Sequence, residues 1–395
     1  MSPRPDRDRA IQFAKRLRRR IYLADYTDEN LRNRWVGESP APYSEQVFDV
    51  RPDPETTKTI LIFKPDEIGD AVYSLPAVRA LKQHFPNAQL FLLCQRLTEP
   101  LYQRSGLFDE IVAVEPGSWL TRPTFDVERQ LARFSVGSFD LSIFLRTYPA
   151  YFRQFLKIPS RARLHPADPG MRSDSVYRAH VSLWDDERAH QALQLLEIVG
   201  KATGQAYTFD DVTYPEFAWT EDDRRADEIV FGGAPPERYV VVHPFAKDET
   251  RQYPLSDWAE LIARVRDDLD ATWVIVGGPG DPQLESAPGV IQAQGKLTLS
   301  QTGLLSAGAT AFLGVLSGPA HWAAALGTPT VTVMSGHSLP VEWAPLGRTL
   351  VLRADVPCAP CHQKTCPVYG LACLTELRPE RIAPSVARFL VSAGA

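Results

Sequence analysis

The chain has 395 residues, of which 44% are hydrophobic and 23% charged, and its formal net charge is −5. This length suits two domains of ordinary size plus an extension, and the apolar content excludes a disordered protein. No apolar run reaches the roughly 18 residues of a membrane-spanning helix, and no apolar segment of a secretory signal follows the basic start. We therefore expect a protein of the cytoplasm.

The N-terminal region, residues 1–57, differs in charge from the rest of the chain. Residues 1–20 carry eight basic side chains against two acidic ones, which leaves the remaining chain acidic and argues against nucleic-acid binding. A basic amphipathic helix is predicted over residues 8–25, because apolar residues recur there at helical spacing: Ile11, Ala14, Leu17 and Ile21. Such a helix suits peripheral contact with an anionic membrane surface, and a solvated or partner-binding helix is the alternative. Residues 26–57 are polar and contain prolines, so we expect a connector.

From Thr59 onward, short apolar runs alternate with helical stretches. The pattern predicts, in chain order, a strand at Thr59–Phe63, a helix at Asp70–His84, a strand at Gln89–Cys94, a helix at Leu97–Ser105, and strands at Glu110–Val114 and Phe139–Leu145. Pro76 should kink or restart the first of these helices. The region 150–235 is less regular, with one helix expected at His190–Thr203. This rhythm predicts a parallel sheet covered by helices on both faces.

The same rhythm restarts after a cluster of prolines and glycines at 215–236, where we expect the domain junction. The expected elements are strands at Arg238–His243, Thr272–Val276, Ala311–Leu316 and Pro329–Met334, and helices at Leu255–Leu269, Leu299–Ala307 and Pro319–Leu326. The sequence thus predicts an α/β protein of two doubly wound domains, 58–225 and 226–395, facing across a cleft. Ligands of such sheets bind beyond the carboxyl ends of the strands.

The first candidate site is the segment Lys64–Asp70, directly after a strand and at the start of a helix. Gly69 permits a tight turn and a close approach of a ligand to the backbone. Asp70 could take the proton from an attacking hydroxyl, and Lys64 could hold charge nearby. The alternative is that Asp70 only complements the helix dipole.

The second candidate is Ser317–His321, again between a strand and a helix. Ser317 is a favourable N-cap and Pro319 suits the first turn, and a helix start of this kind attracts phosphate. With Gly318, small residues leave the backbone N–H groups accessible. His321 is either a phosphate or sugar contact or a core histidine, and an ordinary capped helix remains the alternative.

Two further loops follow strands of the second half. In His243–Pro254, Lys247 and Arg251 can reach a diphosphate, and arginine can grip it with two parallel hydrogen bonds. A solvated basic loop is the alternative. In Gly277–Asp281, a glycine-rich strand end precedes an acid that could accept hydrogen bonds from ribose hydroxyls, although a plain turn has the same appearance.

Four of the five cysteines lie close together near the C-terminus: Cys358, Cys361, Cys366 and Cys373. A reducing cytoplasm makes a disulfide framework unfavourable. Four thiols within 16 residues could close a tetrahedral zinc or iron site, and plain thiols are the alternative.

Taken together, these segments resemble glycosyltransferase family 9, the ADP-heptose:lipopolysaccharide heptosyltransferase family. The resemblance runs from about Thr59 to Ile382, and its strongest strings are ILIFKPDEIGDAVYSLPAVRALKQHFPNAQL, HPFAKDETRQYPLSDWAELI and FLGVLSGPAHWAAALGTPTVTVMSG. It implies a GT-B fold and an inverting, single-displacement transfer of a sugar from a nucleotide diphosphate donor, an ADP-sugar first, to a glycan or glycolipid such as lipopolysaccharide core. The basic helix expected at residues 8–25 suggests attachment to the inner face of the membrane, where lipid-linked glycan acceptors lie.

The resemblance assigns roles by position. Asp70 is the implied general base, and Arg251 is the implied residue that steadies the departing diphosphate. We expect the acceptor to bind near Lys64 and Gly69. The resemblance implies that Ser317, Gly318 and His321 form the donor-binding loop. From the residues themselves, we expect Lys247, Thr250, Gly278 and Pro319 to complete the donor-binding set. No metal is required for the transfer, because basic side chains and a helix end stabilise the leaving group. One branch of the family has a four-cysteine iron site, which makes the cysteine cluster a candidate structural zinc or iron site.

One position departs from the family pattern. Members usually carry an acid before the SGPAH string, where this chain has Leu316, and leucine cannot accept hydrogen bonds from sugar hydroxyls. The transferred sugar is therefore left open between heptose and another hexose-like sugar. Two alternative functions also stay open: a binding protein that keeps the fold without the transfer, and a GT-B nucleotide-sugar epimerase.

Overall fold

The protein is described from a computed structural model. The structure describes residues 21–26, 52–115, 125–145, 149–165, 190–266, 269–284, 288–366 and 370–395. These residues form two compact units. The N-terminal unit holds the described residues from 52 to Trp219, and the C-terminal unit holds Thr220–Ala395 together with strand β1, Ile21–Tyr26.

The N-terminal unit is built on a five-stranded parallel sheet with the strand order β4-β3-β2-β5-β6. Its strands are β2 (Thr59–Lys64), β3 (Gln89–Gln95), β4 (Glu110–Val114), β5 (Phe139–Phe144) and β6 (Ser160–Leu164). The central strand β2 and its neighbour β3 are mainly apolar and almost wholly buried, as expected for a sheet covered on both faces.

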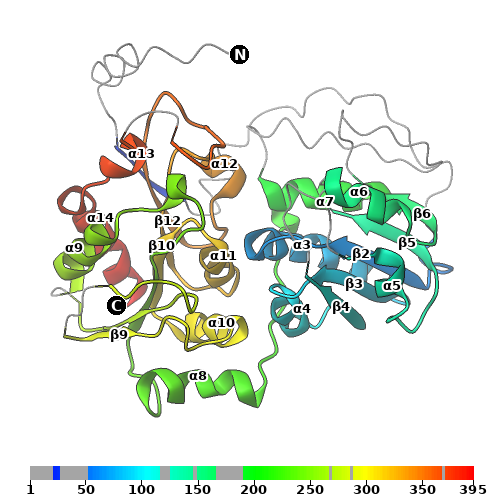
Figure 1. Cartoon of the computed structure of the whole chain (residues 1–395), viewed down its shortest axis with the longest axis horizontal. Helices are drawn as coiled ribbons and strands as arrows, with labels where there is room; N and C mark the ends of the chain where they lie inside the picture. Colours follow the sequence, from blue (N-terminus) through cyan, green and yellow to red (C-terminus); the bar gives the residue numbers. More distant parts are fainter. Residues whose placement is uncertain are drawn as a thin grey trace. The chain divides into compact units, whose positions relative to one another are not determined.

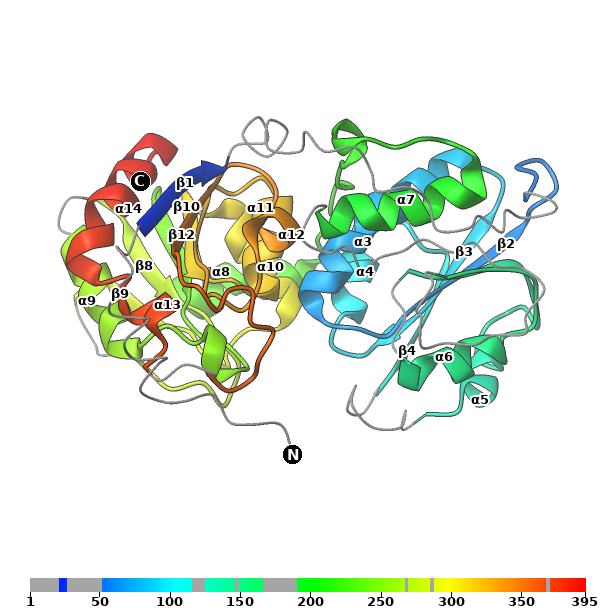
Figure 2. The same cartoon turned by 90° about the horizontal axis from the view of Figure 1, so that it is seen from above.

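Helices cover this sheet on its two sides (Figure 2). They are α3 (Ile68–His84), α4 (Glu99–Ser105), α5 (Val127–Leu131), α6 (Pro149–Leu156) and α7 (Gln191–Thr203), followed by a 3₁₀ turn η1 (Phe209–Asp211). Helices α5 and α6 share an aromatic cluster with β2 and β5, in which Phe63 and Phe144 meet edge to face with ring centroids 4.9 Å apart. Helix α3 packs beside α7.

Helix α3 continues through Pro76, so the prediction that this proline restarts the helix is wrong. Proline removes one backbone hydrogen bond from a helix interior. Here Pro76 and its neighbours on both sides are buried, so packing compensates for the lost bond.

The C-terminal unit has a seven-stranded sheet with the order β1-β12-β11-β10-β7-β8-β9. Its other strands are β7 (Tyr239–His243), β8 (Thr272–Ile275), β9 (Val290–Gln292), β10 (Ala311–Val315), β11 (Thr330–Val333) and β12 (Thr349–Ala354). Six strands run parallel, and β1 alone pairs antiparallel, on β12.

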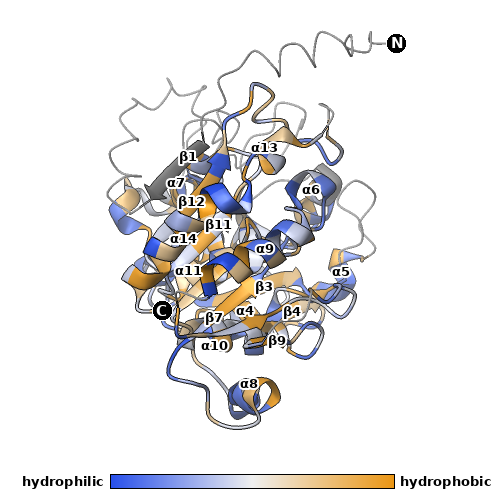
Figure 3. Ribbon diagram, turned by 90° about the vertical axis from the view of Figure 1, so that its left-hand side faces the viewer, coloured by the Kyte–Doolittle hydropathy of each residue, from blue (hydrophilic) through white to orange (hydrophobic). Residues whose placement is uncertain are grey.

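Helices lie on both faces of this sheet as well (Figure 1). They are α8 (Glu221–Phe231), α9 (Leu255–Arg266), α10 (Leu299–Gly308), α11 (Gly318–Ala325), α12 (Pro340–Trp343), α13 (Ala372–Thr375) and α14 (Pro379–Ala393), with a 3₁₀ turn η2 (Glu249–Arg251). Alternate strand residues enter two separate clusters. Val240 and Val242 pack with α9 and α14, whereas Val241 packs with α10 and α11. In Figure 3 the strands are largely apolar, whereas the helices carry both polar and apolar residues.

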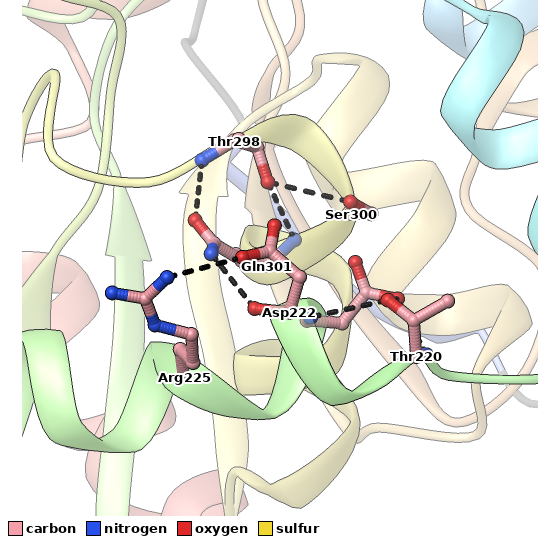
Figure 4. A network of polar contacts seen from close by, with 7 residues as sticks. Thr220, Asp222, Arg225, Thr298, Ser300 and Gln301 are labelled. Atoms are coloured by element: carbon pink, nitrogen blue, oxygen red, sulfur yellow. Dashed lines mark hydrogen bonds and ion pairs between the residues drawn. The ribbon is translucent and has the colours of Figure 1, made fainter.

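The start of the C-terminal unit is fixed by two reciprocal helix caps (Figure 4). Thr220 caps α8 together with Asp223, and Thr298 caps α10 together with Gln301. The side-chain amide of Gln301 then donates to the carbonyl of Asp222 at 3.0 Å, which ties the two helix ends together. Helix α8 therefore occupies residues that the sequence assigned to the domain junction.

The helix predicted over residues 8–25 can be compared with the structure only at residues 21–25, because residues 8–20 lie outside the described residues. At residues 21–25 the prediction is wrong. Residues 21–26 form β1, which pairs with β12 from Ile21 opposite Ala354 to Tyr26 opposite Thr349. An added strand covers an otherwise unpaired sheet edge, a tertiary preference that overrides local helical spacing.

None of the helices in the described parts of the chain is long and apolar enough to cross a bilayer.

Candidate functional site

Each sheet has one point at which the direction of strand addition reverses. In the C-terminal unit β7 leads to β8 on one side, while the neighbouring strand β10 leads to β11 on the other. In the N-terminal unit the same reversal lies between β2 and β5. Ligands of open α/β sheets bind beyond the strand ends at such switch points. The loops that follow β7, β10 and β2 are three of the loops singled out from the sequence.

Ser317 and His243 meet at the switch point of the C-terminal unit. The Ser317 hydroxyl lies 3.2 Å from Nδ1 of His243, the last residue of β7. Ser317 is the N-cap of α11, but its side chain does not cap the helix. The first-turn N–H groups of α11 are thus left without this side-chain acceptor, which suits an anion at the helix end.

The Ser317–His243 contact depends on the protonation state of the histidine and on the small size of a neighbouring residue, Gly314. Burial lowers the pKa of His243 to about 4, so the ring is neutral near pH 7. Gly314 lies beside His243, and a Cβ there would approach the His243 carbonyl oxygen to 2.5 Å. Only glycine therefore allows β10 to come this close to β7.

Helix α11 itself carries the remaining predicted residues of this loop. Gly318 and Pro319 form its partly exposed first turn. The side chain of His321 is buried, with 5% of its surface exposed, and this agrees with the core interpretation of that residue.

The loop after β7 folds around the side chain of Gln252. Its amide group donates to the Pro244 carbonyl at 2.9 Å and accepts from the Ala246 N–H at 2.8 Å. Arg251 forms an ion pair with Asp248, and 34% of its side chain stays exposed. Lys247 is exposed on the same loop. Arg251 and Lys247 thus lie at the switch point, on a loop that is held by internal hydrogen bonds and an ion pair.

Thr250 has a different role from the expected donor contact. It is buried, with 3% exposed, and its hydroxyl donates to the carbonyl of Gln363 at 2.5 Å. Sequence reasoning missed this bond because it joins positions 113 residues apart.

The strand end at Gly277–Asp281 also has internal partners. The Gly278 N–H donates to the Asp281 carboxylate at 2.6 Å, so this carboxylate closes its own turn. A Cβ at Gly277 would lie 2.7 Å from both Asp281 and the Phe245 ring, so glycine is required there by packing. At Gly278 a Cβ would meet only ordinary contact distances.

In the N-terminal unit, Lys64 is fully buried and forms an ion pair with Asp66. The amide of Gln95, at the end of β3, donates to the Asp66 carbonyl. Lys64 therefore braces the loop between β2 and α3, and its side chain is fully buried. Asp66 lies only two residues after Lys64, so the ion pair between them could have been predicted from the sequence.

Gly69 and Asp70 lie in the first turn of α3, and both are partly exposed. The buried phenols of Tyr73 and Tyr102 have pKa values well above the ordinary value, mainly because of burial, and the negative charge of Asp70 adds to both shifts. The Asp70 carboxylate therefore lies near two buried tyrosines.

His337 is a residue that sequence reasoning missed. It follows β11, with its Nδ1 2.7 Å from the Ser338 hydroxyl and its ring centroid 5.8 Å from that of His362. Burial, with the nearby charges of Arg251 and His362, lowers its pKa to about 4. The available signal was its position shortly after β11, a strand of the same parallel sheet.

The four clustered cysteines are free thiols, and all four lie in described parts of the chain. Burial raises the pKa of Cys373 to about 11. Within the described residues no group of three His, Cys, Asp or Glu side chains is placed to hold a metal ion.

Comparisons with known proteins agree on one family. A profile described as "Glycosyltransferase family 9 (heptosyltransferase)" matches residues 159–372. Lipopolysaccharide heptosyltransferase 3 of Escherichia coli K12 is 24% identical over 301 residues, which cover 72% of this chain and 84% of that protein.

Solved structures match the fold of both units. ADP-heptose lipopolysaccharide heptosyltransferase II of E. coli aligns with a TM-score of 0.63 and 20% identity, covering 85% of this chain and 100% of that one. The iron-containing dodecameric glycosyltransferase TibC of enterotoxigenic E. coli aligns with a TM-score of 0.51 and 14% identity, covering 85% and 77%. The two parallel-sheet units are those of a GT-B fold. The chain belongs to glycosyltransferase family 9, and it is a heptosyltransferase-like glycosyltransferase.

Proposed function

We propose that the protein transfers a sugar, with inversion, from a nucleoside diphosphate donor to a hydroxyl of a glycan acceptor. The donor binds the C-terminal unit at the β7–β10 switch point, and the acceptor binds the N-terminal unit near Gly69. The observation that carries this proposal is the switch point itself, where a partly exposed arginine and an uncapped helix start occur together.

The donor's diphosphate is the leaving group, and two features suit it. Arg251 can offer guanidinium N–H groups beyond the one that reaches Asp248, and Lys247 adds a second positive charge. The first turn of α11, with Ser317, Gly318 and Pro319, offers backbone N–H groups and the positive end of a helix dipole. Charge that develops on the departing diphosphate is stabilised at both places.

Asp70 acts as the general base. It removes the acceptor proton as the oxygen attacks the anomeric carbon from the face opposite the diphosphate. Its position in the first turn of α3, beside buried tyrosines, places it in a partly desolvated environment.

The donor and acceptor follow from the relatives. Lipopolysaccharide heptosyltransferases are among the similar proteins, so ADP-heptose and a lipopolysaccharide-core acceptor are the first pair to test. Leu316 marks the place where a different hexose-like sugar would be selected. We also propose that the protein works at the inner face of the membrane, where such acceptors are assembled.

No cofactor is needed for this transfer. Structural zinc or iron on Cys358, Cys361, Cys366 and Cys373 is a separate proposal, motivated by their spacing and by the iron of the TibC neighbour. Metal analysis of the purified chain, with a Cys358→Ser variant as the comparison, tests it. A metal content below about 0.1 per chain in both would reject it.

The main proposal is tested with a panel of nucleotide sugars. The donor should raise the melting temperature, because a ligand of the native state stabilises it. Transfer to a lipopolysaccharide-core acceptor is then followed directly. Donor binding without transfer to any acceptor would favour the binding-protein alternative, and turnover without an acceptor would favour an epimerase.

A further inference from the structure

The turn that carries Arg251 is held on both sides by buried hydroxyl groups. On one side, Thr250 donates to the carbonyl of Gln363 at 2.5 Å. On the other side, the Tyr253 hydroxyl donates to the carbonyl of Leu377. Both donors are buried, at 3% and 0% exposure, so water cannot replace these bonds without opening the unit.

The two acceptors belong to the same part of the chain, the described residues 356–366 and 370–377, which we call the cysteine-bearing segment. Beyond its bonds to the arginine turn, this segment is anchored on the loop after β11. The Cys361 N–H donates to the Gly336 carbonyl at 3.0 Å, and the His362 N–H donates to the His337 carbonyl at 3.1 Å. The approach is close, because a Cβ at Gly336 would lie 3.2 Å from that of Ala359.

The end of the segment is part of the core of the C-terminal unit. Cys373, Leu374 and Leu377 belong to the same apolar cluster as Tyr253 and Trp258. The Tyr253 and Trp258 rings meet edge to face with centroids 5.2 Å apart. The segment is thus a fixed support for the turn.

The arginine turn needs such support. It is a 3₁₀ turn of three residues, Glu249–Arg251, and so short an element has little stability of its own. Arg251 itself has one ion pair, with Asp248, and its Nε is buried without a hydrogen-bond partner in the described part of the chain. The direction of the guanidinium group is therefore set by the backbone that Thr250 and Tyr253 hold.

We propose that Thr250 and Tyr253 are positioning residues, through which the cysteine-bearing segment sets the direction of the Arg251 guanidinium group. Only the expected effect on donor binding rests on the proposed function, in which Arg251 binds the diphosphate of the donor. It replaces the expected direct contact of Thr250 with the donor by an indirect role.

Thr250→Val removes the hydroxyl at nearly constant shape, and Thr250→Ser keeps it. Thr328→Val is the matched control, because Thr328 is also buried, at 4% exposure, and donates to the Ser306 carbonyl at 2.7 Å. All are compared by melting temperature, by donor KM and kcat, and by crystal structure. We expect Thr250→Val to raise the donor KM about tenfold, as misplacement of a binding group does. Thr250→Ser should restore the wild-type value, and Thr328→Val should lower the melting temperature without changing the donor KM.

A double-mutant cycle with Arg251→Ala tests whether Thr250 acts through the arginine. The Thr250→Val effect on donor KM should vanish when Arg251 is absent. Additive effects, or a crystal structure of Thr250→Val in which Arg251 keeps its place, overturn the positioning role. If Arg251 moves and donor binding is unchanged, the positioning stands and the proposed function of Arg251 fails.

Discussion

Ser317 and His243 are 74 positions apart in the chain, yet the serine hydroxyl lies 3.2 Å from the imidazole Nδ1. The contact joins the ends of β10 and β7, the two strands between which the sheet changes its direction of growth. It also takes the serine hydroxyl away from the helix it precedes, so the start of α11 is left for a ligand.

Asp70→Asn should lower kcat by about 10²–10⁴-fold, because general-base assistance is typically of that size. Donor affinity should not change, because the donor is proposed to bind the other unit. Steady-state kinetics and calorimetric donor binding check both statements. Asp109→Asn is the control, since that carboxylate also belongs to the N-terminal unit but pairs with Lys82 at 3.0 Å. Full turnover in Asp70→Asn would remove Asp70 from the mechanism.

Gly314→Ala should destabilise the C-terminal unit by about 1–3 kcal/mol, the usual cost of overpacking a core. The new Cβ would meet the His243 carbonyl oxygen at 2.5 Å, and a backbone atom cannot swing aside as a side chain can. Urea unfolding measures the change. Gly233→Ala serves as the control, since a Cβ there has nothing within 4 Å. Equal stability of the two variants would contradict the close approach of β10 and β7.

The stability of the protein should depend on pH through His243. Its pKa is about 4 in the folded protein, against about 6.5 for an exposed histidine, because burial disfavours the charged ring. Between these values the unfolded chain binds more protons than the folded one, so the free energy of unfolding falls as pH is lowered from about 6.5 to about 4. His337 acts in the same direction.

The His243→Asn variant isolates this contribution. Its unfolding free energy, measured by urea titration at pH 7 and at pH 5, should fall less between the two pH values than that of the wild type. An equal fall in the unfolding free energy of the wild type and of the variant would show that His243 is readily protonated in the folded protein.

Leu316→Asp should change the choice of donor sugar. A carboxylate at this position can accept hydrogen bonds from sugar hydroxyls, and a hydrogen bond to a charged group contributes about 1.5–3 kcal/mol, or about 10- to 150-fold in affinity. We expect kcat/KM for ADP-heptose to rise relative to donors with fewer hydroxyls. Leu316→Ala separates this gain from a simple loss of bulk. An unchanged order of donors in Leu316→Asp would show that position 316 does not face the sugar.

The sequence by itself determined the class of fold. Runs such as Ile60–Phe63 and Ala311–Leu316 contain only apolar residues and glycine, as is typical of strands covered on both faces, and they alternate with helical stretches. That pattern placed Asp70, Arg251 and Ser317 after strands, where ligands of parallel sheets bind. The IGD and SGPAH strings supplied the family, which the profile match confirmed.

The tertiary structure decided which of these side chains are available. Lys64 and Thr250 lie at the expected loops, but Lys64 pairs with buried Asp66 and Thr250 bonds to Gln363. Residues 21–26 likewise became an edge strand on β12, although their spacing suited a helix. Each of these outcomes depends on partners distant in the chain or on a free sheet edge, and local periodicity carries no information about long-range partners.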